Sequence, residues 1–453
     1  MSENEVQLHI DLGDGLLLRR ATIDDIEQLA EFVAVNGGDL QEPEESTAIW
    51  TRDLMDGNLP NFGPQDWTLV EHSRERRIVS TLNLISQTWS YGGINFGVGR
   101  VDAVMTHQEY RRRGLIRAQM DLVHQWSARR GEQVQSITGI PWFYRQFGYE
   151  FALALNGGRG GYGQNVPNLN EGEMEPYIVR QAREEDLGLV TQLYSKGMER
   201  YLVSCVRNKE MFKYDLEAPI GKATRWNVTC VIESQSGEPI GILRHGYRLR
   251  NGEMAAGIYE IQSGTSWISV TPSVIRYLSE TGKIYAAREN KSYNGEFSLS
   301  LGTEHPAYEA IGDQLPKIER SQIPPAWYIR VANLPKFIMH IAPVLEQRLV
   351  DSAAVDYTGE LNIGFTQGGL RIFFANGKLT VERRLPTQND LSETWNTVDA
   401  LFPGLTFLQL VFGFRTLEDI EYAYPDCLIT SDEARGVLKA LFPKRPSMVY
   451  GIQ

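Results

Sequence analysis

Cysteine is scarce in this 453-residue sequence, which contains only Cys205, Cys230 and Cys427. Their number is odd and their spacing matches no metal-ligand motif, which argues against a disulfide framework and a structural zinc site. We therefore expect no metal ion in the protein. A reducing compartment such as the cytoplasm suits three unpaired thiols.

Long apolar runs are also missing. Residues 1–15 are acidic and lack the apolar core of a signal peptide, and no later run nears the length of a membrane-spanning helix. The sequence therefore predicts a soluble cytoplasmic protein that does not engage a membrane.

Positive charge is in deficit as well. The 45 Lys and Arg residues face 57 Asp and Glu residues, for a formal net charge of −12. This balance disfavours a broad nucleic-acid-binding surface and weakly favours cationic ligands. The seven histidines are dispersed, and no serine–histidine–acid arrangement is visible among them.

What the sequence does contain is one informative stretch, from Val101 to Met120. It reads as a strand, a polar turn, an arginine-rich loop ending at Gly114, and a helix with apolar residues at helical spacing. Such a loop points backbone N–H groups and a helix dipole at one spot beside fixed guanidinium groups, as a pyrophosphate site requires. The alternative is a basic cluster on a solvated helix face.

A second informative segment follows the strand predicted at residues 134–138. It is the aromatic sequence FYRQFGY, from Phe143 to Tyr149. Its position places a phenol near the arginine-rich loop, and Tyr144 is our candidate. The alternative is that these rings only pack the end of a sheet.

The chain also contains an internal repeat, because residues 179–187 reproduce the pattern of residues 18–26. The equivalent pairs are Arg19 with Arg180, Ala21 with Ala182, and Asp25 with Asp186. No arginine–glycine loop follows the strand predicted at residues 255–262. We expect the second copy to have lost the anion site and to play a structural role.

These patterns divide the chain into four segments. Residues 1–157 form a first domain, 158–176 a glycine- and asparagine-rich linker, 177–325 a second copy of the first domain, and 326–453 an antiparallel domain with a hairpin turn at Asn376-Gly377. The predicted fold class is α+β with mixed sheets.

The arginine-rich loop resembles motif A of the GNAT superfamily of N-acetyltransferases, Arg/Gln-x-x-Gly-x-Gly/Ala, with Ile116 where a small residue is usual. The FYRQFGY segment resembles a signature found after the fifth strand of many of these enzymes. The resemblance implies that the loop holds the pyrophosphate of coenzyme A and that a bulged strand directs an amide at the acetyl carbonyl. The implied cofactor-binding residues are Val104, Met105, Thr106, Arg111, Arg112, Arg113, Gly114, Leu115 and Ile116.

The order of segments resembles, over nearly the whole chain, the Eis (enhanced intracellular survival) acetyltransferases. That resemblance implies a catalytic GNAT domain, a degenerate GNAT domain and a domain like sterol carrier protein, assembled as homohexamers. It implies transfer from acetyl-CoA to primary amines such as aminoglycosides, polyamines or lysine side chains. Tyr144 would be the general acid, the terminal carboxylate of Gln453 the general base, and Trp50 a wall of the acceptor pocket. The family's chains usually end in an aromatic residue, and this one departs from that.

The chemistry agrees with direct transfer without an acyl-enzyme. A primary amine with a pKa of roughly 10 must lose a proton before it attacks a thioester, and the oxyanion needs a preorganised donor, here a strand-bulge N–H near Met105. Two other classes stay open. One is another tandem-GNAT acyl or aminoacyl transferase, and the other is a lipid-binding carrier protein.

Overall fold

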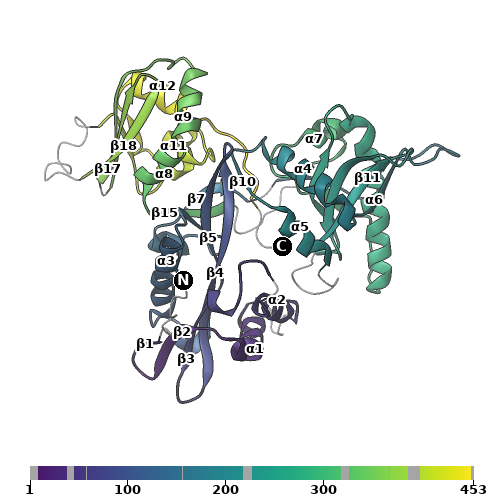
Figure 1. Ribbon diagram of the computed structural model, residues 1–453, viewed down its shortest axis with the longest axis horizontal. Coiled ribbons are helices and arrows are strands. Elements are labelled where there is room, and N and C mark those ends of the chain that lie inside the picture. The colour runs from purple at the N-terminus through teal and green to yellow at the C-terminus, as the bar shows by residue number, and fades with distance from the viewer. Residues whose placement is uncertain are drawn as a thin grey trace.

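The computed structural model describes residues 9–37, 45–57, 59–155, 157–217, 227–317, 326–366, 368–385 and 398–449. These residues form three lobes, each built on its own mixed sheet (Figure 1). The first lobe is mainly purple and blue in the figure, the second is teal, and the third is green to yellow. The architecture is α+β, as the sequence predicts.

The first sheet has nine described strands, in the order β1-β2-β3-β4-β5-β6-β15-β7, with β10 paired to β4. Their bounds are β1 His9–Asp11, β2 Leu16–Arg20, β3 Trp67–His72, β4 Arg77–Tyr91, β5 Ile94–Thr106, β6 Val134–Ile137, β7 Glu150–Ala154, β10 Val203–Cys205 and β15 Ala326–Val331. Helix α3 (Leu115–Arg129) packs on one face of the sheet, whereas α1 (Ile26–Asn36) and α2 (Glu45–Met55) pack on the other (Figure 1). The sheet thus separates two apolar clusters.

The second lobe has a sheet of six described strands, in the order β8-β14-β13-β12-β11-β9. Its strands are β8 Arg159–Gly161, β9 Tyr177–Gln181, β11 Asn227–Ser234, β12 Pro239–Gly246, β13 Met254–Ile261 and β14 Phe297–Leu299. Its helices are α4 Leu187–Met198, α5 Lys209–Glu217, α6 Trp267–Arg288 and α7 Pro306–Ile311. Within the predicted linker, residues 159–161 form β8 and pair with β14.

The third lobe has a sheet of five described strands, in the order β18-β17-β16-β19-β20. Its strands are β16 Gly359–Phe365, β17 Gly368–Ala375, β18 Lys378–Arg384, β19 Ala400–Phe402 and β20 Leu428–Ile429. Its helices are α8 Leu334–His340, α9 Ala342–Val350, α10 Phe407–Val411, α11 Leu417–Ala423 and α12 Asp432–Leu441. Asn376 and Gly377 both have positive φ in the tight turn between β17 and β18, so the predicted hairpin is confirmed.

An ion-pair cluster fixes the start of the first lobe. The guanidinium of Arg19 on β2 lies 2.7 Å from a carboxylate oxygen of both Asp25 and Glu71. Asp25 also accepts a hydrogen bond from the backbone N–H of Thr22, which begins the turn into α1. Beside Glu71, the register between β3 and β4 shifts by a bulge. One arginine thus ties a strand, a helix start and a bulged edge together.

The second lobe repeats this cluster with its own residues. Arg180 on β9 lies 2.7 Å from carboxylate oxygens of Asp186 and Glu233. The backbone N–H of Arg183 donates to Asp186, and the register between β11 and β12 shifts beside Glu233. The pairs of arginine and aspartate predicted from the sequence therefore occupy the same structural roles in both lobes, which confirms the internal repeat.

Strand β15 links the third lobe to the first. It lies at the start of the predicted third domain, yet it pairs with β6 on one side and β7 on the other, within the first sheet. Its Tyr328 stacks on Phe151 with ring centroids 3.9 Å apart and meets the edge of Tyr144 at 5.6 Å. Because β15 fills the space between two strands of the first lobe, that lobe is completed by residues from the last third of the sequence.

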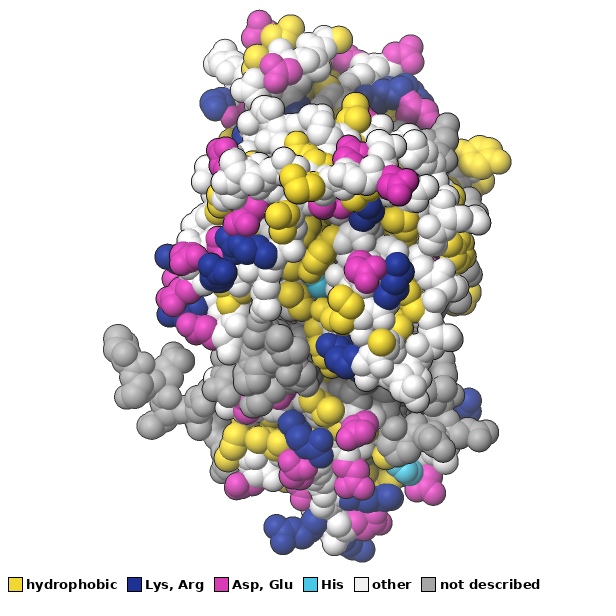
Figure 2. Space-filling view, turned by 90° about the vertical axis from the view of Figure 1, so that its right-hand side faces the viewer, with side chains coloured by type: hydrophobic (Ala, Val, Ile, Leu, Met, Phe, Trp, Pro, Cys, Tyr) yellow, Lys and Arg dark blue, Asp and Glu magenta, His cyan; other side chains and the backbone are white. Residues whose placement is uncertain are grey.

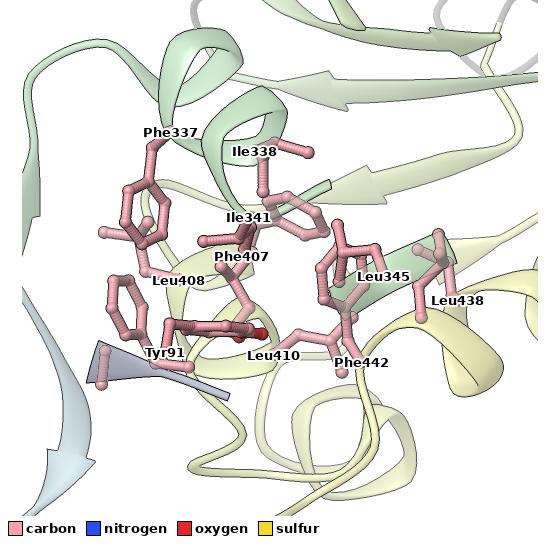
Figure 3. Packing of buried hydrophobic residues seen from close by; sticks show 14 of the residues in the cluster. Tyr91, Phe337, Ile338, Ile341, Leu345, Phe407, Leu408, Leu410, Leu438 and Phe442 are labelled. Carbon is pink, nitrogen blue, oxygen red and sulfur yellow. The ribbon is translucent and has the colours of Figure 1, made fainter. Parts of the chain in front are cut away.

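A second junction lies at the far end of β4. Tyr91 reaches into the apolar core of the third lobe, between Phe337 and the helices that follow (Figure 3). Its hydroxyl donates to the carbonyl of Val411 at 2.7 Å, and the Arg348 guanidinium donates to that hydroxyl at 3.3 Å. A buried tyrosine with both hydrogen-bonding roles used is a firm anchor between two lobes.

The side of the molecule on which the second lobe lies carries mixed charges. On this face Lys and Arg side chains are interspersed with Asp and Glu, and hydrophobic side chains gather along its middle (Figure 2). A basic stripe of the kind that binds nucleic acid has a different pattern. In the described part of the chain, none of the helices has the length and hydropathy needed to cross a membrane.

The junction at β15 leads to a first prediction. Replacing Tyr328 by Ala removes a fully buried ring from the core and should lower the free energy of unfolding by about 3–5 kcal/mol. The measurement is a urea titration followed by far-UV circular dichroism. Tyr422→Ala is the control, because Tyr422 is 92% exposed and its removal should change stability by less than about 0.5 kcal/mol. Equal midpoints for the two variants would contradict the role given to β15.

Candidate active site

The centre of the candidate site is the place where strands β5 and β6 part. These parallel strands pair only from Val98 to Arg100 on β5 and from Val134 to Ser136 on β6. Strand β5 continues to Thr106, and beyond Arg100 its edge toward β6 has no strand partner among the described residues. Backbone N–H and C=O groups on that edge are therefore available to a ligand.

A bulge reshapes β5 just beyond the parting point. Thr81 lies opposite Met105 and Asn83 lies opposite Asp102, so two steps along β4 match three along β5. Ala103 takes up the extra residue with a φ of 51°, a left-handed conformation that costs a residue with a Cβ about 1–3 kcal/mol and is concentrated at functional sites. The bulge adjoins Val104, Met105 and Thr106, the strand residues that the sequence singled out.

The arginine-rich loop follows β5 and leads into α3. Arg112 and Gly114 both have positive φ, at 64° and 76°, and Gly114 is the residue that caps α3. The side chains of Arg111, Arg112 and Arg113 are exposed. Arg111 donates to the carbonyl of Thr106 at 3.3 Å, which holds its guanidinium against the end of β5.

The first turn of α3 supplies the other half of this anion site. Leu115 is buried and Ile116 half-buried, so their side chains pack into the core while their backbone N–H groups belong to the unsatisfied first turn of the helix. Those N–H groups, the helix dipole and the exposed guanidinium groups together suit a doubly charged phosphate group. A Cβ built on Gly114 meets no atom within 4 Å. Glycine is therefore favoured at this position for its positive φ, and not for lack of space.

Tyr144 lies on the short helix Phe143–Phe147, directly after the strand that diverges from β5. Its side chain is 4% exposed, and a Cβ on Gly139 would approach its ring to 2.9 Å. Burial raises the pKa of the Tyr144 phenol well above its usual value, and the charge of Asp102 adds to the effect. The hydroxyl therefore keeps its proton throughout the neutral range.

The helix carrying Tyr144 is fastened to the start of α3. Arg117 donates to the side-chain oxygen of Gln146 at 2.8 Å, and its guanidinium lies over the ring of Phe147. Further along α3, a ring nitrogen of His124 lies 2.8 Å from the Tyr149 hydroxyl. Burial lowers the pKa of His124 to about 3, so this imidazole is neutral at physiological pH and serves as a packing partner.

Trp50 lies on the opposite face of the sheet. It sits on α2 and meets Trp67 of β3 edge-on, with ring centroids 6.2 Å apart. Met105 and Tyr214, the latter from α5 of the second lobe, pack against the same cluster. Tyr144 and Val104 belong to the cluster on the α3 face, so the bulge of β5 stands between the two groups. Gln453, the predicted base, lies outside the described residues.

The structure adds three polar residues that the sequence analysis missed. Asn83 and Arg100 are buried in the middle of the sheet, and Asp102 lies on the bulge. A nitrogen of the Arg100 guanidinium donates to Asp102 at 2.6 Å, and the backbone N–H of Ala103 donates to the same carboxylate at 2.8 Å. The signal was present as single polar residues inside apolar strands, in STLNLIS and GRVDAVM.

The equivalent region of the second lobe is built differently. A cavity of about 240 Å³ lies where β13 leads into α6, but no arginine–glycine loop borders it. Arg200 reaches it from the segment after α4 and donates to both carboxylate oxygens of Glu260 at 2.5 and 2.6 Å. In this lobe the Arg200 guanidinium is therefore already neutralised by the Glu260 carboxylate. Across the described ranges, no group of three or more His, Cys, Asp or Glu side chains is placed to hold a metal ion.

Comparison with known proteins agrees with this geometry. Residues 18–152 match the family model described as an acetyltransferase (GNAT) domain. No curated protein matches the sequence.

Solved structures resemble nearly the full length of the chain at low sequence identity. A probable N-acyltransferase from Enterococcus faecalis is 14% identical, with a TM-score of 0.63 over 96% of this chain and 98% of its own. A GCN5-related N-acetyltransferase from Kribbella flavida is 16% identical, with a TM-score of 0.63 over 96% and 97%. Eis1 from Mycobacterium abscessus is 14% identical, with a TM-score of 0.57 over 97% and 99%. At these identities the likeness shows a shared fold. Residues 18–152 are therefore a GNAT acetyltransferase domain, and the chain that carries it is an acetyltransferase enzyme.

Proposed function

We propose that this enzyme transfers the acetyl group of acetyl-CoA directly to a primary amine, and that it belongs with the Eis acetyltransferases. The observation that carries the proposal is the bulge at Ala103, which lies between the parting of β5 from β6 and the arginine-rich loop. The full-length likeness to Eis1 from Mycobacterium abscessus supports the family assignment.

The proposed place of acetyl-CoA follows from the polar groups along β5 and α3. The pyrophosphate lies at the exposed guanidinium groups of Arg111, Arg112 and Arg113 and at the N–H groups from Gly114 to Ile116. The amide portion of the thiol arm runs along the unpaired edge from Val104 to Thr106 as an additional strand would. The backbone N–H of the bulge near Met105 faces the acetyl carbonyl and stabilises the oxyanion as the amine attacks.

Tyr144 acts on the departing sulfur. Its buried hydroxyl stays protonated and donates a hydrogen bond to the negative charge that builds on sulfur as the C–S bond breaks. A thiol is a stronger acid in water than a phenol, so this hydrogen bond contributes first. The thiolate then takes the phenol's proton, and the second proton that the acylated nitrogen must release restores the Tyr144 hydroxyl.

The acceptor enters from the other face of the sheet, past Trp50. The ring of Trp50, packed on Trp67, gives this side an aromatic wall, and Tyr214 adds a residue from the second lobe. An alkylammonium group is attracted to aromatic faces. The amine must lose a proton before it attacks, and we propose the terminal carboxylate of Gln453 as the base.

The anion site gives a prediction for cofactor binding. Replacing both Arg111 and Arg112 by Ala removes two charge-assisted contacts, each worth about 1.5–3 kcal/mol. Isothermal calorimetry should show affinity for coenzyme A reduced by roughly 100-fold or more. Arg129→Ala removes an exposed arginine at the far end of α3 and should leave the affinity unchanged. Undiminished affinity in the double variant would refute the assignment of the loop.

The role of Tyr144 is tested by Tyr144→Phe, which keeps the ring and removes the hydroxyl. Turnover measured as free thiol release from acetyl-CoA should fall by roughly 10²–10⁴-fold, while affinity for coenzyme A stays the same.

A chain lacking its last four residues should lose turnover too, and a shift of its pH–rate profile would identify the missing base. Unchanged turnover in both variants would remove the proposed acid and base and leave the cofactor site standing.

A further inference from the structure

A connecting segment, residues 201–217, passes from the first sheet to the second lobe. Its first part, β10, pairs with the far end of β4 in the first sheet. Its second part, α5, carries Tyr214, which packs against the same apolar cluster as Trp50. Residues 206–208 separate the two elements, which lie between the first and second lobes (Figure 1). The position of β10 therefore determines where α5 stands on the acceptor face.

Buried contacts anchor the same segment to the second lobe. The hydroxyl of Tyr194 on α4 donates to the carbonyl of Cys205 at 2.8 Å. The guanidinium groups of Arg207 and Arg244 both donate to the Asp215 carboxylate, at 2.6 and 3.0 Å, which ties α5 to β12. Because the first sheet and the second lobe hold the same short segment, a displacement of β10 moves the two lobes relative to one another.

A C-terminal segment, residues 446–449, occupies the second edge of β10. The backbone N–H of Leu202 donates to the carbonyl of Pro446 at 2.7 Å, and the N–H of Met448 donates to the carbonyl of Val203 at 2.8 Å. A parallel β-bridge joins the two segments at the same place. Strand β10 is three residues long, and pairing on both edges uses backbone groups that would otherwise lack a protein partner.

The C-terminal segment is itself held by all three lobes. The side chain of Met448 packs against the apolar core of the second lobe. Val449 belongs to the core that the first and third lobes share. Just before the segment, the N–H of Arg445 donates to the carbonyl of Gly413 in the third lobe at 3.1 Å. The segment therefore fixes β10 to both neighbouring cores.

We propose that the C-terminal segment is a positioning element for the acceptor. By pairing with the second edge of β10 it holds α5, and with it Tyr214, against the wall that contains Trp50. This inference rests on the proposed amine acetylation and concerns the acceptor side of the same site. The role is separate from that of the proposed base, because residues 446–449 act through backbone pairing and Gln453 lies four residues further on.

Hydrogen–deuterium exchange of the full-length protein tests the pairing. Met448→Pro removes the N–H that donates to Val203, so exchange across residues 203–217 should become roughly 10-fold faster, as expected for one lost hydrogen bond. Exchange in β5 and α3 should stay the same. Met448→Leu is the matched control, because it keeps the N–H and a side chain of similar volume. Unchanged exchange in Met448→Pro would overturn the proposal.

A second control separates the C-terminal segment from the chain end. The chain lacking its last four residues keeps residues 446–449, so it should exchange across residues 203–217 as the wild type does. Fast exchange in this variant and normal exchange in Met448→Pro would assign the positioning role to the chain end and overturn the proposal.

Kinetics test the consequence for the acceptor. The probe is whichever of spermidine, kanamycin and Nα-acetyl-lysine amide binds the wild type most tightly by calorimetry. Its KM should rise by roughly 10–100-fold in Met448→Pro, since small misplacements of binding groups cost that much, while affinity for coenzyme A stays the same. An equal loss of coenzyme A affinity would show a general loosening of the first lobe and overturn the assignment.

A double-mutant cycle identifies the residue through which the segment acts. Tyr214→Ala should also raise the KM for the amine. If Met448→Pro acts by displacing Tyr214, the double variant should be no worse than the more damaging single variant. Two effects that multiply independently would show that the C-terminal segment does not position Tyr214, which a merely structural role would also produce.

Direct binding distinguishes this proposal from the proposed reaction. Calorimetry without acetyl-CoA should show weaker binding of the same amine to Met448→Pro than to the wild type. This result with no thiol release from any amine would overturn the reaction and keep the positioning role. Thiol release with the same KM for the amine in both proteins would overturn the positioning role and leave amine acetylation standing.

Discussion

The insertion of β15 between β6 and β7 is the constraint on which the rest of the site depends. Strand β6 must leave β5 after three paired residues, and a short strand with one free edge would be unstable there. Pairing with β15 satisfies the other edge of β6 over its full length. The same strand brings Tyr328 against Tyr144, so the parted strands and the proposed acid are fixed by one segment.

The bulge on β5 explains why the two sets of proposed site residues lie on opposite faces. Successive strand residues point to opposite sides of a sheet, and the extra residue at Ala103 changes that alternation at the centre of the site. Val104 belongs to the cluster with Tyr144, whereas Ala103 and Met105 belong to the cluster with Trp50. Two substrates can therefore approach one point from two sides, which direct transfer between them requires.

Local sequence patterns predicted the parts of the structure that local physics determines. The arginine-rich loop, the helix after Gly114 and the turn at Asn376-Gly377 follow from backbone preferences and helical periodicity within a few residues. The repeat was visible because Arg19 and Arg180 each need an aspartate six residues later for the same ion pair.

The long-range pairings could not be read in the same way. Residues 326–331 have the apolar pattern of a strand, but nothing in AWYIRV specifies that their partners lie about 190 residues earlier. The polar residues beside the bulge were missed for a related reason. Asn83 and Asp102 are far apart in the sequence, and only the register of β4 against β5 places them side by side. A single buried polar residue looks like an exception to a pattern until its neighbour across the sheet is known.

The path of the chain through the first sheet has a consequence for how the protein is made. A ribosome releases the N-terminal lobe first, and most domains begin to fold as they emerge. Here the packing around Tyr144, the proposed proton donor, stays incomplete until the polypeptide has grown past Val331. The strand that completes it, β15, is among the later ones to be translated. During synthesis the nascent chain therefore exposes the edges of β6 and β7, and the first sheet is completed only when nearly three quarters of the protein has been produced.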